Sequence, residues 1–194
     1  MATVTIQPTD DTDGKDTLVM NAAYVNSNYG TNIQMFLGYR SAWSATARFM
    51  VQFDLSPYAN ATINTATFST YCESTNENES GNNTMGCYQI TASWVESTVT
   101  WNLQPTVSGS AESTLVWNAN TTGWRAYDIK SLTQDWVNGD KSNYGVMVKN
   151  ATDGQKPMFN ISSSGRASNE PKLYLDYTPA PAGISDRLLR GMGS

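Results

Sequence analysis

The sequence has 194 residues, which is long enough for one sizeable β domain with its own core but cramped for two packed domains. It carries 12 basic and 17 acidic residues and no histidine, so its net charge is −5. Because phosphate binding needs a basic field, this balance disfavours nucleic acid and anionic lipid as partners. The apolar runs are strand-sized, so we expect no insertion into a membrane.

Alternating apolar and polar residues predict many short strands along the chain. The clearest is 48–55, where Phe49, Val51 and Phe53 face one side with a period of two. Similar patterns between turn-rich stretches predict further strands at 3–8, 17–24, 32–39, 62–73, 86–94, 98–101, 124–129, 144–148, 157–161 and 172–177. Residues 103–113 are expected to form a loop around Pro105.

One segment has helical character. Residues 130–137 are expected to form a short helix that ends at Asn138-Gly139, because glycine tolerates the left-handed conformation at a helix C-terminus. Many short strands at this spacing, with a single helix among them, predict an all-β fold. We expect an antiparallel β-sandwich of the jelly-roll type, with one short helix and a C-terminal tail.

The stretch 94–101, WVESTVTW, holds one acid between two tryptophans. It predicts the end of one strand, a short corner and the start of the next. Glu96 is expected to accept hydrogen bonds from backbone amides at this corner. The alternative is a buried catalytic carboxylate with a raised pKa, but the chain has no histidine, the commonest general base near neutral pH. The chain is therefore predicted not to be an enzyme.

Two cysteines, Cys72 and Cys87, flank a loop rich in Asn, Glu and Gly. They either form a disulfide that staples a hairpin or remain free, partly buried thiols. Cys72 shares the parity of the apolar positions in its strand, whereas Cys87 has the opposite parity in its own strand. Regular strands would therefore direct the two thiols to opposite faces, which favours free thiols.

An acidic loop near the N-terminus contains Asp11, Asp13 and Asp16. Calcium prefers oxygen ligands, so this loop is a candidate calcium site, although its spacing is not that of an EF-hand. The alternative is a solvated acidic turn. The sequence predicts no other cofactor.

Short motifs recur along nearly the whole chain up to Tyr177. They are 28–30, 48–56, 63–68, 94–101, 123–124, 128–129, 134–139, 143–145 and 171–177. In order and spacing they resemble the disaggregatase-related, DNRLRE-type domains, which are β-sandwich modules of microbial surface proteins, polysaccharide-degrading enzymes and some virion proteins. Some relatives are classed as carbohydrate-binding modules, including alginate binders, so the resemblance implies a carbohydrate-binding-module-like domain. These motifs do not fix which residues contact a ligand.

Exposed aromatic rings are the candidate ligand contacts, because a ring face packs against the C–H face of a sugar. The tryptophans inside the family motifs are expected in the core: Trp94, Trp101, Trp124 and Trp136. Two other tryptophans lie in polar, loop-like stretches, and three tyrosines take outward parity in their strands. The candidate binding residues are therefore Trp43, Trp117, Tyr39, Tyr71 and Tyr174. The alternative for them is ordinary surface or inter-chain packing.

The composition changes after Thr178. Residues 1–178 are expected to form the β-sandwich, 179–183 a stiff Pro/Ala linker, and 184–194 an apolar tail. The apolar positions of the tail are Ile184, Leu188, Leu189 and Met192. An isolated helix of this length is marginal in water, so we expect the tail to dock on a protein scaffold or on further copies of the chain. The alternative is docking on its own domain, or an expression remnant.

These features predict a non-catalytic surface module that binds carbohydrate and is presented on a larger assembly through its tail. The alternative function is a purely structural decoration, fibre or capsid-associated subunit of a virion or cell-surface assembly. A strand pattern opens the chain in place of a secretory signal, so the sequence is either a mature or recombinant form or that of a protein made in the cytoplasm that leaves as part of a particle. Neutral polar residues are abundant, which suits a protein that works outside a cell or on a particle surface. The expected location is therefore extracellular, on a cell or virion surface.

Overall fold

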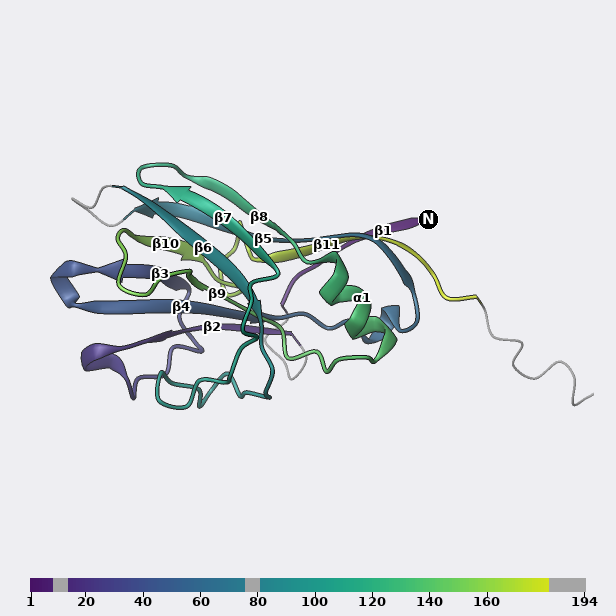
Figure 1. Cartoon of the computed structure of the whole chain (residues 1–194), viewed down its shortest axis with the longest axis horizontal. Coiled ribbons are helices and arrows are strands. Elements are labelled where there is room, and N and C mark those ends of the chain that lie inside the picture. Colours follow the sequence, from purple (N-terminus) through teal and green to yellow (C-terminus); the bar gives the residue numbers. More distant parts are fainter. Residues whose placement is uncertain (9–13, 76–80, 182–194) are drawn as a thin grey trace, which may run out of the picture.

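The structure, a computed structural model, describes residues 1–8, 14–75 and 81–181. Its elements are β1 (Ala2–Ile6), β2 (Lys15–Met20), β3 (Gln34–Arg40), β4 (Ala45–Gln52), β5 (Thr62–Thr75), β6 (Asn82–Gln89), β7 (Ser113–Asn118), β8 (Gly123–Asp128), α1 (Lys130–Asn138), β9 (Val146–Asn150), β10 (Met158–Ser162) and β11 (Lys172–Thr178). The strands pair in the order β1-β11-β5-β10-β3-β4-β9-β6-β7, with β2 on β4 and β8 on β5. All these pairings are antiparallel, and the sheet curls around a central core (Figure 1).

The all-β class and the short helix agree with the sequence predictions. Helix α1 ends at Gly139, whose φ of +77° gives the left-handed cap that glycine tolerates. One hydrogen-bonded ladder links β1 to β7 without a break, so a jelly roll of two separate sheets is not confirmed. Two local predictions are wrong. Residues 98–101 are irregular rather than a strand, and β7 forms where the sequence pattern predicts none.

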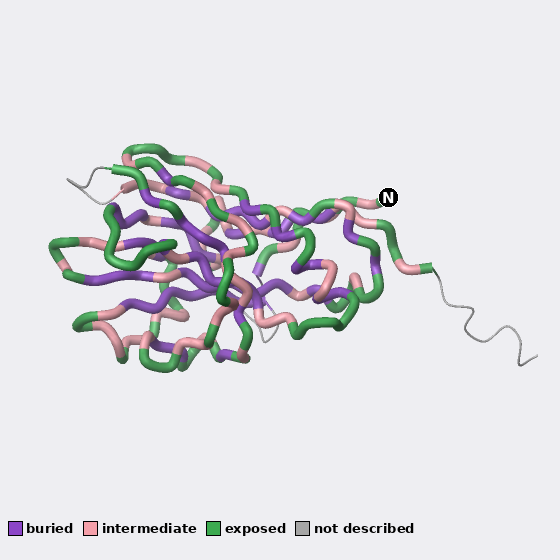
Figure 2. Tube along the Cα trace, viewed as in Figure 1, coloured by how far each residue is buried: buried purple, intermediate pink, exposed green. Residues whose placement is uncertain are grey.

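The main core lies inside the curl, and Figure 2 shows the buried stretches running along the strands. Phe49 and Val51, the inward positions that the alternation of β4 indicates, are fully buried there. Phe68 of β5 and Phe159 of β10 belong to the same core. Strand β4 is buried along both faces, rather than half-buried as its alternation predicts, because a second apolar cluster covers its outer side.

Residues 90–112 supply this cover over the outer face of β4 and β9. Trp94 packs there with Met50 of β4 and Met147 of β9. Its indole Nε1 donates a 2.9 Å hydrogen bond to the carbonyl of Tyr144. The WVESTVTW stretch therefore fastens a covering loop onto the sheet instead of turning one strand into the next.

Glu96 is a structural acceptor, as the sequence predicts. Its carboxylate accepts a 3.2 Å hydrogen bond from the backbone N–H of Asp16 in β2. The side-chain amide of Asn28 donates to the carbonyl of Glu96 at 2.7 Å and to that of Val99 at 2.8 Å. These bonds tie the covering loop to two segments that are distant in the sequence.

The prediction that Trp117 is an exposed binding residue is wrong, because its side chain is 0% exposed. Its position in β7 lies between exposed neighbours, so the strand directs the indole inward. The indole Nε1 donates a 2.9 Å hydrogen bond to the hydroxyl of Tyr127. The ring also meets that of Phe159 with centroids 5.0 Å apart. Trp117 therefore anchors β7 on the core.

Cys72 and Cys87 are free, as expected. Both lie in the main core, however, so the prediction that they face opposite sides of the sheet is wrong. Ile90 does not mark the core face of its strand, because it packs under the covering loop on the outer side. Burial raises the pKa of the Cys87 thiol far above its usual range, so this thiol stays protonated.

The tail positions Ile184, Leu188, Leu189 and Met192 lie outside the described residues, and the linker is described only as far as Pro181. Strand β11 ends beside the N-terminal strand, because Ala2 pairs with Tyr177. In the part of the chain that the structure describes, no helix has the length and apolarity that crossing a bilayer requires.

Replacing Glu96 with Gln should lower the free energy of unfolding by about 1 kcal/mol, because the acceptor for the Asp16 N–H loses its charge. Urea denaturation followed by tryptophan fluorescence measures this change. Ser97→Ala is the matched control, because Ser97 is an exposed neighbour and its truncation should leave stability unchanged. If Glu96→Gln were as stable as the parent, Glu96 would not fasten the covering loop.

Replacing Tyr127 with Phe should lower the free energy of unfolding by about 1–3 kcal/mol, because it leaves the buried Trp117 Nε1 without its acceptor. The same substitution at the exposed Tyr174 is the control and should be neutral. Thermal and urea unfolding of both variants measure the difference. Equal stability of the two variants would contradict the assignment of the Trp117–Tyr127 hydrogen bond to the core.

Candidate functional site

An exposed tryptophan marks the outer face of the sheet where β8, β5 and β11 lie side by side. Trp124 of β8 is 39% exposed, although tryptophan is large and apolar. It pairs in register with Tyr71 of β5, and the two rings meet edge to face with centroids 5.3 Å apart. Such a pair contributes about 0.5–1.5 kcal/mol beyond burial, so it holds the exposed indole in one orientation.

Lys172 of β11 contacts the same indole from the other side of β5. Its Nζ lies 3.7 Å from the centroid of the Trp124 ring, a cation–π contact. Ser69 of β5 lies between the two strands, in register with Lys172, and is only 8% exposed although it faces outward. The indole and the lysine stem therefore form a fixed cap over Ser69.

Tyr174 extends this exposed surface along β11. It lies two residues beyond Lys172, pairs with Thr67 of β5 and is 40% exposed. Side chains two residues apart in a strand share a face, so Tyr174 projects to the same side as the other three. We call Tyr71, Trp124, Lys172 and Tyr174 the aromatic platform.

A surface hollow adjoins the platform where the chain passes from β7 to β8, and we call it the β7–β8 hollow. Its volume is about 380 Å³, and it is lined by Leu115, Val116, Asn118, Thr121, Trp124, Arg125 and Ala126. Nη2 of Arg125 donates to the carbonyl of Thr121 at 2.9 Å and to its hydroxyl at 2.8 Å. The hollow therefore combines apolar walls with a guanidinium that is already held in position.

The alternation of β8 explains why Trp124 faces outward. Tyr127 is fully buried, so the positions of opposite parity, 124, 126 and 128, face solvent. The chain enters β8 through Gly123, whose φ of +115° is a conformation that favours glycine. The expectation that Trp124 lies in the core is therefore wrong. The inward parity of Tyr127 and Ile129 was the signal in the sequence that could have found it.

Of the predicted binding residues, the structure brings Tyr71 and Tyr174 together on the platform. It adds Trp124 and Lys172, neither of which the sequence pattern indicates as a binding residue. Tyr39 lies elsewhere, half-buried in β3.

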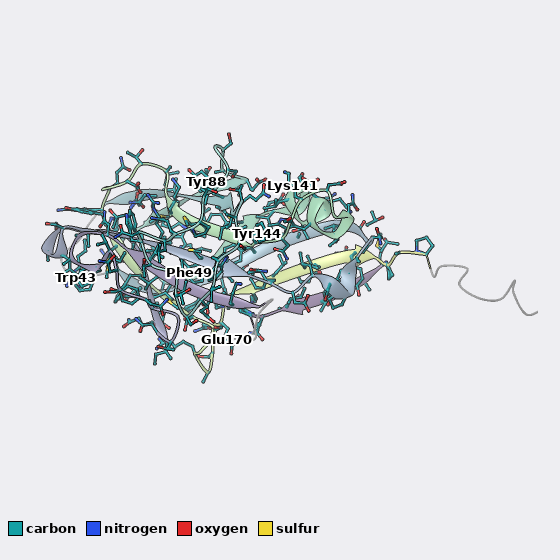
Figure 3. All side chains as sticks on the ribbon, turned by 90° about the horizontal axis from the view of Figure 1, so that it is seen from below. Trp43, Phe49, Tyr88, Lys141, Tyr144 and Glu170 are labelled. Carbon is teal, nitrogen blue, oxygen red and sulfur yellow. The ribbon has the colours of Figure 1, made fainter. Side chains whose placement is uncertain are left out.

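Trp43 also lies away from the platform. It occupies the 3₁₀ turn Ser41–Trp43 at the end of the β3–β4 hairpin, far from α1 (Figure 3). Arg40 lies over its ring at 4.0 Å from the centroid, and Phe36 meets the ring edge-on at 5.5 Å. The ring of Trp43 is half-buried among these groups, whereas Trp124 is 39% exposed, so Trp43 is the weaker candidate.

A smaller hollow, of about 240 Å³, lies where the end of β4 meets α1. Trp136 lines it, but this side chain is buried and presents little ring surface. Asp54 lines it too, and its carboxylate is engaged by the backbone N–H of Ser56 at 2.8 Å. This hollow therefore offers a ligand less than the aromatic platform does.

The proposed calcium ligands divide between described and undescribed residues. Asp11 and Asp13 lie outside the described residues. Asp16 is buried, and its carboxylate accepts hydrogen bonds from the backbone N–H of Ser164 at 3.0 Å and from the Ser164 hydroxyl. Among the residues that are described, no three Cys, Asp or Glu side chains gather as a metal site. The calcium site remains a prediction of the sequence.

A charged pair borders the platform. Glu73 follows Tyr71 on the outward side of β5 and accepts hydrogen bonds from the Arg166 guanidinium and, at 2.7 Å, from the Ser162 hydroxyl. Burial alone would raise the pKa of Glu73, but the bonds from Arg166 and Ser162 outweigh it and hold the pKa below its usual value. Glu73 therefore stays ionised with Arg166 as its partner.

This face is suited to recognition rather than turnover. Exposed rings offer apolar contact to C–H groups, while Arg125, Asn118 and Thr121 present donors and acceptors for hydroxyl groups. An all-β domain with such an outer surface has the properties of a carbohydrate-binding module.

The chain belongs to carbohydrate-binding module family 96, whose family model matches residues 3–177. No curated protein matches the sequence. The family match confirms the broader prediction of a carbohydrate-binding-module-like domain, and it implies a non-catalytic domain that binds glycans. The narrower disaggregatase-related, DNRLRE type stays a prediction.

Proposed function

We propose that this chain is a non-catalytic module that binds a glycan at the aromatic platform and the β7–β8 hollow. The observation that carries the proposal is the exposed indole of Trp124, which Tyr71 and Lys172 hold on the outer face of the sheet. Membership of carbohydrate-binding module family 96 supports carbohydrate as the class of ligand.

A sugar ring stacks on the free surface of the indole and directs its hydroxyls toward the hollow. Arg125 presents a guanidinium there that Thr121 has already oriented, and Asn118 lines the same hollow. Donors that are already held in place lose little conformational freedom on binding. The shallow, open surface gives modest affinity and leaves the glycan chemically unchanged.

We also propose that the module is displayed on a larger assembly, on a cell or virion surface, through residues 184–194. Figure 1 places the N-terminus and the end of β11 at one end of the molecule and the connection between β7 and β8 at the other. Attachment beyond Thr178 leaves the hollow facing away from the scaffold. A purely structural subunit would share this attachment but would bind no glycan.

Replacing Trp124 with Ala should weaken glycan binding about tenfold or more, because the stacking surface is lost. Affinity electrophoresis in gels containing alginate, xylan, mannan or hydroxyethylcellulose measures retardation of the parent and the variant. Leu103→Ala is the matched control, since Leu103 is an exposed apolar residue of the covering loop away from the platform.

Retardation of the parent and of Leu103→Ala, together with free migration of Trp124→Ala, supports the site. The unfolding midpoint of Trp124→Ala reports whether the variant is folded. If Trp124→Ala is folded and is retarded as strongly as the parent, the glycan binds elsewhere on the chain.

Deleting residues 184–194 should abolish self-assembly while leaving the thermal unfolding midpoint unchanged, because the deletion starts beyond the last strand. Size-exclusion chromatography with light scattering compares the full and the shortened chains. A full chain that is monomeric, or a shortened chain that assembles equally well, would contradict self-assembly through the tail.

A further inference from the structure

Two exposed aromatic rings lie far apart on the same outer face. Trp124 is level with Tyr71 of β5, whereas Tyr174 is level with Thr67. Four residues along β5 and two strand spacings across it separate their Cα positions, which is about 16 Å on a flat sheet. A disaccharide is shorter than this separation, so it can stack on one of the two rings but not on both.

Short side chains form the outer surface between the two rings. Thr67, Ser69 and Ala126 occupy outward positions there, and their side chains are short. The ammonium of Lys172 lies against the Trp124 indole and supplies a hydrogen-bond donor at that end of the diagonal. A flat ligand can therefore lie across the strands from one ring to the other.

The same surface continues past both rings. Next to Tyr174 is Thr5 of β1, which is exposed and pairs with Tyr174. Next to Trp124 is the β7–β8 hollow, whose outer wall includes the exposed Val116. A track that is open at both ends accepts a chain that enters on one side and leaves on the other.

We infer that this face binds an internal stretch of a linear polysaccharide, with Trp124 and Tyr174 as two separate stacking positions on one glycan chain. This inference rests on the proposed function and adds the form of the ligand, which is the interior of a polymer rather than a chain end or a free sugar. The polymer runs from the β7–β8 hollow over Trp124 and Lys172 to Tyr174.

The two-ring arrangement sets a length requirement. Each stacking contact is modest alone, but the second contact becomes intramolecular once the first has formed. Affinity therefore rises steeply when an oligosaccharide is long enough to reach both rings, and it levels off beyond that length. A site built around one ring has no such step.

Calorimetry with a ladder of oligosaccharides tests this requirement. The ladder runs from disaccharide to octasaccharide and is prepared from whichever of alginate, xylan, mannan or hydroxyethylcellulose retards the parent in gels. We expect the parent to bind the hexasaccharide at least about tenfold more tightly than the disaccharide. Tyr174→Ala should lose about tenfold for the hexasaccharide and nothing for the disaccharide, because the disaccharide occupies Trp124 and the hollow.

Two further variants complete the test. Tyr174→Phe keeps the ring and should retain the length step, whereas Trp124→Ala should weaken binding at every length. Equal affinity of the parent for disaccharide and hexasaccharide, or an equal loss at both lengths in Tyr174→Ala, would overturn the two-ring track and leave the proposed function standing. Failure of all four polymers to retard the parent would overturn both.

Discussion

The alternation of β5 is the constraint on which both the core and the candidate site depend. This strand is 14 residues long and pairs with β8, β10 and β11. Its inward residues, including Phe68, fill the core, while its outward residues, including Tyr71, support the platform. Because the side-chain period is two, a slip of one residue would exchange the two sets. The packing that stabilises the core therefore also fixes the position of the platform.

Two regions of the outer face of the curled sheet differ, and the difference supports the proposed site. Over β4 and β9, residues 90–112 bury Met50 and Met147 beneath Trp94. On the strands that flank β5, by contrast, Trp124 and Tyr174 remain in contact with solvent on the outer face. Exposing large apolar rings to water costs free energy. Over β4 and β9 this cost does not arise, because the covering loop buries the apolar residues. Exposed apolar surface of this kind is typical of binding sites, which is why we propose the platform as the site.

Local patterns predict the all-β class, α1 and the inward side of β4, because these depend only on residues near one another in the sequence. They predict the wrong environment for two tryptophans. Trp117, predicted to be exposed, is buried, and Trp124, predicted to lie in the core, is exposed. The phase of each strand decides the face, whereas motif membership and the polarity of neighbours do not. The contribution of Lys172 depends on the pairing of β11 with β5, which brings together segments distant in the sequence and which no local pattern contains.

The orientation of the platform before ligand arrives connects the fold to a binding function. The Tyr71 ring packs against the Trp124 indole, and the ammonium group of Lys172 contacts the same indole. Both residues lie on strands that are hydrogen bonded to their neighbours. A ring held in this way loses little freedom when a sugar stacks on it. A non-catalytic module acts only by binding its ligand, so no later chemical step requires the site to move. A stiff sheet that presents fixed rings is therefore sufficient for the function, and the flexible lids that many enzymes need are not required.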